Sequence, residues 1–259
     1  MGSGQMINEL ASIKHAKPES QSAVSLEQTP NGLTLVADGM ELRGDFSKML
    51  KRVKPGKLQT ELLIKAAKIK RSTNDSADEN VRCPLAIDAT AGLGEDSFLL
   101  AAAGFDVIML ERDETIAALL ADALTRAQND PAIAKIISRM SHSTEDSIAA
   151  LGEWANARPN QKPDVILLDP MFPKRTKSAS VKKKFQLLHE LESPCSEEEP
   201  LLKAAFSANP SKIVIKRPAK GPYLAGVKPS YSVSGKAVRY DVIVTAQTRN
   251  PFFPLDSKT

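Results

Sequence analysis

Cysteine, histidine and tryptophan are scarce in this chain of 259 residues. Its two cysteines, Cys83 and Cys195, lie too far apart to suggest a disulfide framework, so we expect a reduced, cytoplasmic setting. The three histidines lie apart from one another and from both cysteines, which disfavours a metal site. No apolar run approaches the ~20 residues that span a bilayer. Residues 1–6 also lack the pattern of a signal peptide, so we expect neither a metal nor a membrane partner.

Positive charge is in modest excess, with a formal net charge of +4, but it is concentrated in two clusters. The first lies between Lys48 and Lys57. The second runs from Lys174 to Lys184, contains no acidic residue, and is followed by an acidic stretch from Glu190 to Glu199. Such clusters are found at nucleic-acid interfaces and also on ordinary solvated surfaces, so charge alone leaves both interpretations open.

The stretch from Leu85 to Arg112 has the pattern of a strand, a glycine turn, a helix and a second strand. The apolar run before Asp88 predicts the first strand. Gly92 and Gly94 predict a tight turn, because glycine adopts positive φ at little cost. The apolar run before Glu111 predicts the second strand. This pattern is half of a doubly wound sheet, which binds its ligand beyond the carboxyl ends of the strands.

Two cofactors suit such a stretch, and the acidic residues favour one of them. A dinucleotide site needs a third glycine where this chain has Ser97, and it would place a pyrophosphate beside Glu95 and Asp96. S-adenosylmethionine (SAM) fits better, because its ammonium and sulfonium can approach Asp88 and Asp96. Glu111 can accept hydrogen bonds from both ribose hydroxyls. A plain strand–helix–strand crossover without a ligand remains the alternative.

Elsewhere the chain predicts strands that alternate with helices, after about 30 polar residues without periodicity. The expected elements are a hairpin at 33–44, a short basic helix or loop at 46–53, a helix at 58–69, a helix with Asp96 or Ser97 as its N-cap and Gly104 after its end, a helix at 114–127, a weak strand near 135–140, a helix at 145–157 capped by Thr144 with Trp154 in the core, a strand at 164–169, a helix at 181–191, a strand at 213–215, and a final hairpin at 231–245.

This order matches the seven-stranded sheet of SAM-dependent methyltransferases better than the six-stranded sheet of dehydrogenases. We therefore predict an α/β fold with a Rossmann-like class I methyltransferase sheet, mostly parallel, that ends in an antiparallel C-terminal hairpin. The polar linker at 71–80 predicts a boundary between a small N-terminal α/β subdomain (residues 1–75) and a methyltransferase domain (residues 76–259).

The segment that follows the buried strand at 164–169 reads Asp-Pro-Met-Phe-Pro and is expected to form a small cup. It is similar to the Asp/Asn-Pro-Pro-aromatic signature of methyltransferases that act on exocyclic or amide nitrogens. An amino group on a purine is a poor nucleophile, because its lone pair is delocalised into the ring. Asp169 and the carbonyl of Pro170 can accept its two N–H bonds, and Phe172 can stack on the base. The alternative is an Asp-Pro turn that ends a strand, with a core phenylalanine.

Several motifs occur together here as they do in the ribosomal RNA small subunit methyltransferase J family, which the chain resembles over roughly residues 85–245. These motifs are DATAGLG at 88–94, MLER at 109–112, LDPMFP at 168–173, KSA at 177–179 with VKK at 181–183, and VIKRP at 214–218. The resemblance implies methyl transfer from SAM to the N2 amine of a guanosine in small-subunit ribosomal RNA. The implied partner is that RNA or the assembled small subunit.

The resemblance also implies a set of functional residues. The family's cofactor contacts fall here on Glu95, Asp96, Glu111, Arg112, Ser143, Thr144 and Asp169, to which the glycine turn adds Asp88, Gly92 and Gly94. Glu95 is a departure, since the family commonly has arginine before the aspartate. The predicted catalytic residues are Asp169, Pro170 and Phe172. The residues expected to hold RNA phosphates are Lys174, Arg175, Lys177, Lys182, Lys183, Lys184, Lys216 and Arg217.

The expected mechanism is direct in-line transfer by positioning, because neither cysteine lies in a motif that would make it a nucleophile. Three alternatives stay open: the same fold acting on a protein or small molecule, a non-catalytic RNA-binding module, and a dehydrogenase. The acidic turn disfavours the dehydrogenase, and the complete glycine turn and Asp169 disfavour the non-catalytic module. The sequence gives no oligomeric state.

Overall fold

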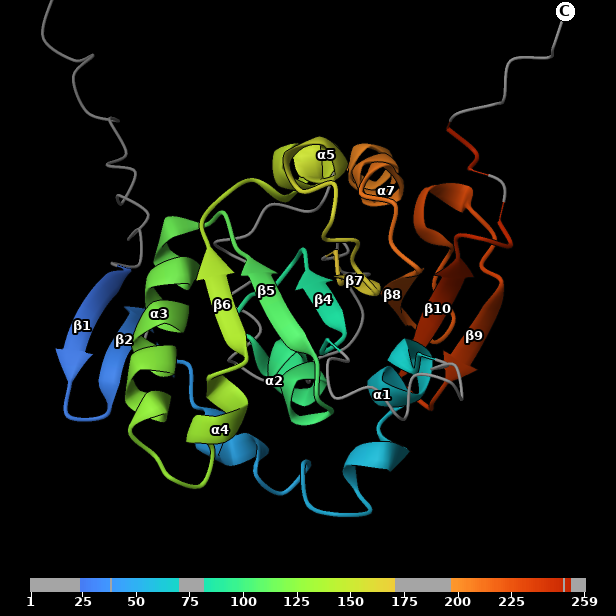
Figure 1. Ribbon diagram of the computed structural model, residues 1–259. Coiled ribbons are helices and arrows are strands. Elements are labelled where there is room, and N and C mark those ends of the chain that lie inside the picture. The colour runs from blue at the N-terminus through green and yellow to red at the C-terminus, as the bar shows by residue number, and fades with distance from the viewer. Residues whose placement is uncertain (1–23, 38, 70–81, 171–196, 249, 253–259) are drawn as a thin grey trace, which may run out of the picture.

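The computed structural model describes residues 24–37, 39–69, 82–170, 197–248 and 250–252. A seven-stranded sheet in the order β6-β5-β4-β7-β8-β10-β9 forms its centre (Figure 1). The strands are β4 (Leu85–Asp88), β5 (Asp106–Leu110), β6 (Met140–Ser143), β7 (Val165–Leu168), β8 (Lys212–Pro218), β9 (Tyr231–Ser234) and β10 (Val238–Val244). The first five are parallel, whereas β10 pairs antiparallel with β8 and β9. This confirms the predicted mostly parallel sheet with its antiparallel C-terminal hairpin.

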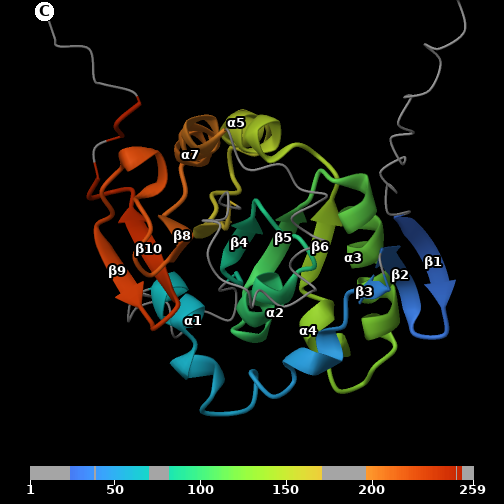
Figure 2. The ribbon, with the colours of Figure 1, turned by 180° about the vertical axis from the view of Figure 1, so that it is seen from behind.

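Helices cover both faces of this sheet. The helices of the described residues are α1 (Leu62–Ala67), α2 (Glu95–Ala102), α3 (Glu114–Gln128), α4 (Ala134–Ile137), α5 (Ser147–Ala157) and α7 (Glu198–Ser207), with 3-10 turns η1 (Phe46–Met49), η2 (Leu58–Thr60) and η4 (Leu224–Gly226). Helices α5 and α7 lie on one face, and α1, α2 and α4 lie on the other (Figures 1 and 2). Because both faces are covered, the central strands are continuous apolar runs, which is what made them predictable.

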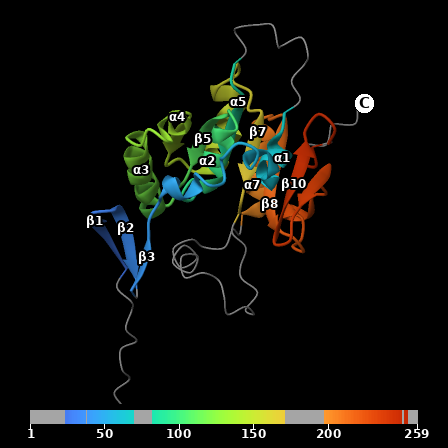
Figure 3. The same ribbon diagram turned by 90° about the horizontal axis from the view of Figure 1, so that it is seen from below.

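A separate three-stranded antiparallel sheet contains β1 (Ser25–Thr29), β2 (Gly32–Ala37) and β3 (Met40–Leu42). It lies to one side of the large sheet (Figure 3) and packs on α3 through a small apolar cluster that includes Leu35 and Leu119. The predicted hairpin is confirmed as β2 and β3. Strand β1 was not predicted, because most of its side chains are exposed and show no alternation.

The segment from η1 to α1 shares its core with the large sheet. Phe46 stacks on Phe98 of α2 with 5.4 Å between ring centroids, and Leu63 and Ala66 lie in the same buried cluster as strand residues. The two predicted domains therefore have contiguous apolar cores where the structure describes them. The proposed boundary at residue 75 falls outside the described residues and stays a prediction.

Two predicted helix caps are wrong. Helix α2 begins at Glu95 after Gly94, which has a φ of 76°, and no side chain caps it. Ser97 is buried and donates its hydroxyl to Asp88 instead. Helix α5 is capped by Asp146 and not by Thr144. Gly104 follows the end of α2 with positive φ, as predicted.

The weak strand expected near residues 135–140 is also misplaced. Residues 134–137 form the short helix α4, and the strand β6 follows at Met140–Ser143. Helix α7 was not predicted, and the helix predicted at 181–191 lies outside the described residues. Trp154 is buried, as expected. None of the helices formed by described residues combines the length and apolarity needed to span a bilayer.

Candidate cofactor and amine site

Parallel strands bring the predicted site residues to one edge of the large sheet. Asp88 ends β4, Glu111 follows β5 and Asp169 follows β7, so their backbones meet at the carboxyl edge. Lys216 lies near the same end of β8, which is parallel to β7. This edge of the sheet therefore gathers three carboxylates and one ammonium.

The turn after β4 is fixed by both neighbouring strands. The amide of Ala89 donates to the carbonyl of Leu167 at 3.0 Å, and the amide of Ala91 donates to the carbonyl of Leu110 at 3.2 Å. Gly92 and Gly94 both have positive φ, which completes the turn into α2. The predicted glycine turn therefore has the conformation that its sequence required.

Asp88 holds this turn against α2. The hydroxyl of Ser97 donates to one of its carboxylate oxygens at 2.6 Å, and the amide of Thr90 donates to the other at 3.2 Å. Its side chain is almost wholly buried, and burial raises the pKa of Asp88 to about 7. The side chain of Asp88 therefore serves mainly to fix the shape of the turn.

Glu111 connects the end of β5 to the same turn. One carboxylate oxygen accepts from the amide of Gly92 at 2.8 Å, and the other accepts from the amide of Asp113 at 3.0 Å. Burial raises the pKa of Glu111. Each oxygen of a carboxylate has a second lone pair, so Glu111 can still accept hydrogen bonds from two ribose hydroxyls.

Lys216 bridges two of the predicted site carboxylates. Its Nζ lies 2.7 Å from Oδ2 of Asp96 and 2.8 Å from Oδ2 of Asp169. Burial alone would lower the pKa of Lys216, but the charges of Asp96 and Asp169 raise it overall. The sequence predicted a phosphate contact for Lys216, whereas its ammonium is engaged by these carboxylates within the site.

Asp169 is held at its backbone and at its carboxylate. Its amide donates to the hydroxyl of Thr90 at 2.6 Å, which ties it to the turn after β4. Burial raises the pKa of Asp169, and the charge of Lys216 opposes that rise. Pro170, the next residue, is buried. Phe172 and the predicted basic residues between Lys174 and Lys184 lie outside the described residues.

Three residues of this site were not predicted from the sequence. Thr90 positions Asp169, Ser97 positions Asp88, and Tyr240 lies directly opposite Lys216 in the pairing of β10 with β8. Burial and the charge of Asp96 raise the pKa of Tyr240, which keeps its phenol neutral. Strand alternation could have placed Tyr240 beside Lys216, but only once the pairing of β8 with β10 was known.

The remaining predicted cofactor residues lie around this edge. Arg112 joins the starts of two helices, because its Nη1 lies 3.0 Å from Asp146 and 3.2 Å from Glu197. Ser143 ends β6 and Thr144 follows it, and the carbonyl of Ser143 accepts from the amide of Glu111 at 3.1 Å. Glu95 is exposed in the first turn of α2.

Arg217 does not fit the predicted role of a phosphate contact. Its side chain has no exposed area, its Nε donates to the carbonyl of Pro222, and its Nη1 pairs with Glu198 of α7. A guanidinium in this position cannot reach a phosphate at the surface. Arg217 therefore holds α7 and the loop after β8 against the sheet.

The carboxylates at this edge suit SAM. Asp96 and Asp169 already hold one cationic nitrogen between them, and a carboxylate pair of this kind favours the cationic end of SAM over a pyrophosphate. Glu111 has further acceptor lone pairs at the same edge. Within the described ranges, no group of three or more His, Cys, Asp or Glu side chains is arranged to hold a metal ion. The sheet order, glycine turn and acidic edge together define a class I methyltransferase fold.

The chain is similar to known proteins in sequence and in structure. Residues 8–245 match the family described as "Putative SAM-dependent methyltransferase". The crystal structure of the SAM-dependent methyltransferase NGO1261 from Neisseria gonorrhoeae superposes with a TM-score of 0.67 at 28% identity, covering 90% of this chain and 87% of that one. The chain therefore belongs to the SAM-dependent methyltransferases, in the family that carries the name ribosomal RNA small subunit methyltransferase J. Its cofactor is accordingly SAM.

Two relatives illustrate that family. The protein of this name from Thioalkalivibrio sulfidiphilus is 42% identical over 191 residues, which cover 73% of this chain and 69% of the relative. The one from Pseudomonas syringae is 43% identical over 159 residues, which cover 61% of this chain. That second match spans only 58% of the relative's own length.

Proposed function

We propose that this protein transfers a methyl group from SAM to the exocyclic N2 amine of a guanosine in small-subunit ribosomal RNA. The observation that carries the proposal is the Asp169 carboxylate, which follows β7 and is paired with Lys216. An ionised acceptor in this position is what a weakly nucleophilic aryl amine requires. The names of the relatives support ribosomal RNA as the source of that amine.

The chain's own residues would act by orientation. Asp169 and the carbonyl of Pro170 accept hydrogen bonds from the two N–H groups of the amine. These bonds draw its nitrogen toward tetrahedral geometry and aim its lone pair at the methyl group. When bound, SAM supplies an activated methyl group on its sulfonium. The nitrogen gains the methyl group and loses one proton, which Asp169 or water can accept. Alignment of this kind accounts for large rate effects without a covalent enzyme intermediate.

The proposed cofactor contacts follow from the same edge. Glu111 would hold the ribose hydroxyls, and Asp96 with Asp169 would face the cationic end of SAM. Gly92 and Gly94 let the backbone approach the ligand closely. The proposed partner is free small-subunit RNA or the assembled subunit, with residues 174–184 as its phosphate contacts. Because ribosomal RNA is the proposed substrate, the cytoplasm is the expected compartment.

The test is transfer of tritiated methyl groups from SAM to under-methylated small ribosomal subunits, followed by digestion to nucleosides. We expect the label in N2-methylguanosine. Asp169→Asn keeps the shape of the side chain but loses an ionised acceptor, so we expect at least about a hundredfold loss of kcat, in the range of general acid–base effects. Cofactor binding without any labelled RNA, at every salt concentration, would instead indicate a protein or small-molecule acceptor.

A further inference from the structure

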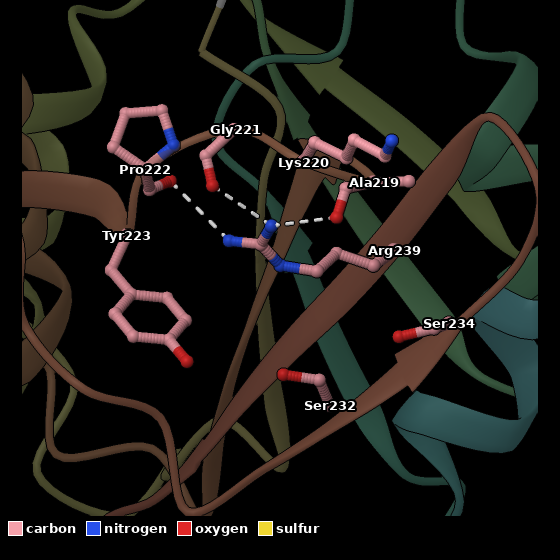
Figure 4. A pocket seen from close by; sticks show the side chains of 8 residues that line it. All are labelled: Ala219, Lys220, Gly221, Pro222, Tyr223, Ser232, Ser234 and Arg239. Atoms are coloured by element: carbon pink, nitrogen blue, oxygen red, sulfur yellow. Dashed lines mark hydrogen bonds between the residues drawn. The ribbon is translucent and has the colours of Figure 1, made fainter.

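A buried arginine fixes the loop that follows β8. Arg239 of β10 is only 8% exposed, and its Nη1 donates to the carbonyls of Pro218, Ala219 and Gly221 at 3.2, 3.1 and 2.9 Å. Figure 4 shows the carbonyls of Ala219, Gly221 and Pro222 converging on the guanidinium. Asp241 pairs with the same guanidinium at 2.8 Å. Arg239 therefore holds this loop against β10, while Arg217 holds it through the carbonyl of Pro222.

This fixed loop presents an exposed aromatic ring beside a groove. Tyr223 is 41% exposed, and its ring centroid lies 5.2 Å from the guanidinium carbon of Arg239, within the range of a cation–π contact. The groove alongside has a volume of about 430 Å³, and its lining includes Lys220, Ser232 and Ser234 (Figure 4). An exposed ring that is supported from behind in this way is a rigid stacking platform.

The groove lies at the same edge of the sheet as the carboxylates. The loop leaves β8 two residues after Lys216, and the amide of Ala219 donates to the carbonyl of Ala237 in the turn between β9 and β10. Arg239 pairs in register with Arg217, which contacts α7, so the groove lies on the α7 side of that edge. The groove and Asp169 therefore share this edge of the sheet, with the adjacent Arg217 and Lys216 pointing to its opposite faces.

The charge around the groove is positive. Lys220 on the loop and Lys236 in the hairpin turn are both exposed. The acidic residue beside them, Asp241, is neutralised by Arg239 and also accepts from the hydroxyl of Ser232. A ligand with a flat ring and a negative backbone complements this combination of an aromatic face, ammonium groups and hydroxyls.

We propose that this groove binds a nucleotide of the RNA next to the target guanosine, with its base on Tyr223 and its phosphates near Lys220 and Lys236. The inference rests on the proposed function. Stacking on an aromatic ring tolerates any base, and a contact of this kind would hold the strand while the target base is turned out of its stack. The groove would thus set the position of the strand and take no part in the chemistry.

The first test compares Tyr223→Ala with Tyr223→Phe and Tyr231→Ala. Tyr231 is equally exposed, at 41%, but its hydroxyl contacts Lys212 at the opposite end of β8, so it is a matched control. For under-methylated small subunits we expect Tyr223→Ala to raise KM roughly 5-fold to 100-fold, as loss of one stacked base would. Tyr223→Phe and Tyr231→Ala should retain the wild-type KM. The Kd for SAM should be unchanged in all three.

The second test does not depend on the folding of Tyr223→Ala, because it changes only exposed lysines. For a single-stranded RNA oligonucleotide from small-subunit RNA, Lys220→Ala and Lys236→Ala should each make the slope of log K against log salt shallower by about 0.7. Unchanged slopes together with an unchanged KM for Tyr223→Ala would overturn the proposal that the groove binds RNA. A groove that binds a protein partner instead would give that result. If the wild-type chain neither binds nor methylates RNA, the proposed function is wrong, and the proposed role of the groove is wrong with it.

Discussion

The ammonium of Lys216 lies 2.8 Å from a carboxylate oxygen of Asp169, and the same nitrogen lies 2.7 Å from Asp96. One side chain of β8 thereby joins the end of β7 to the first turn of α2. The carboxylates of Asp88, Asp96 and Asp169 gather at this edge, and burial first, then their mutual repulsion, raises the pKa of Asp88 and of Asp169. Lys216 is the group that opposes that tendency at Asp169.

Replacing Lys216 by methionine should move the acid limb of the pH–rate profile to higher pH. Without the ammonium, burial and the charge of Asp96 would raise the pKa of Asp169 further, so the active carboxylate would form only at higher pH. We expect about a tenfold to hundredfold loss of kcat/KM at neutral pH, partly recovered in alkaline buffer. Methyl transfer measured between pH 5 and 9 provides the check.

Lys216→Arg is the matched variant for this measurement, because it keeps the charge and should keep the acid limb near its wild-type position. Lys65→Met removes an exposed lysine of α1 and controls for net charge. If Lys216→Met lowers the rate equally at every pH, Lys216 does not act through the ionisation of Asp169.

Asp88 should make the folded state less stable as pH rises. Its pKa is about 7 in the folded protein and 3.8 as the ordinary value, so the native state retains a proton that the unfolded chain has lost between these limits. The free energy of unfolding therefore falls between about pH 4 and pH 7 by roughly 1.4 kcal/mol for each pH unit that is crossed.

Asp88→Asn stays neutral and should lack this fall. Urea unfolding at pH 4 and pH 8 gives the comparison: the two proteins should be similar at pH 4, and the variant should be the more stable at pH 8. Parallel stability curves for the two proteins would show that Asp88 does not titrate in this range.

The two glycines of the turn should differ in their tolerance of alanine. Both have positive φ, which costs roughly 1–2 kcal/mol for a residue with a Cβ. A Cβ on Gly92 would meet no atom within 4 Å, whereas a Cβ on Gly94 would lie 3.0 Å from Leu120 and 3.2 Å from Phe46. We expect Gly94→Ala to lose about 1–3 kcal/mol more than Gly92→Ala, because overpacking adds to the backbone cost.

Denaturant midpoints measure this difference directly. Calorimetry of SAM binding to both variants separates an effect on folding from an effect on the cofactor site. Gly92→Ala is the informative variant, because it alters the turn without crowding the core. Equal destabilisation by both variants would mean that the apolar contacts around Gly94 relax at no cost.

The buried strands and the long helix α3 could be predicted because each carries its own signal. The residues of β4 and β7 form continuous apolar runs, and α3 has an apolar stripe at helical spacing. Strand β6 carries no such signal, because Met-Ser-His-Ser becomes a strand only by pairing with β5. Strand β1 likewise depends on β2 for its hydrogen bonds.

The residues of the site also divide into those that the sequence predicts and those that it does not. Asp88, Glu111 and Asp169 end apolar runs, so their place at the carboxyl edge follows from the sequence. The role of Lys216 depends on which strand lies beside β7 and on which face its side chain takes, and neither is encoded locally. The sequence therefore identified a charged residue at the end of β8 and could not distinguish an ion pair within the site from a contact with phosphate.

Arg217 provides the sharpest test of that distinction, because the next residue along β8 has the opposite environment. Its guanidinium is fully buried and pairs with Glu198 at 3.3 Å. Arg217→Met should destabilise the protein by roughly 3 kcal/mol, since it leaves the Glu198 carboxylate without its partner. The double variant Arg217→Met with Glu198→Gln should regain part of this loss, because no unpaired charge remains. Urea unfolding measures both. The salt dependence of RNA binding should be unchanged in the single variant, and a slope shallower by about 0.7 at full stability would return Arg217 to the phosphate contacts.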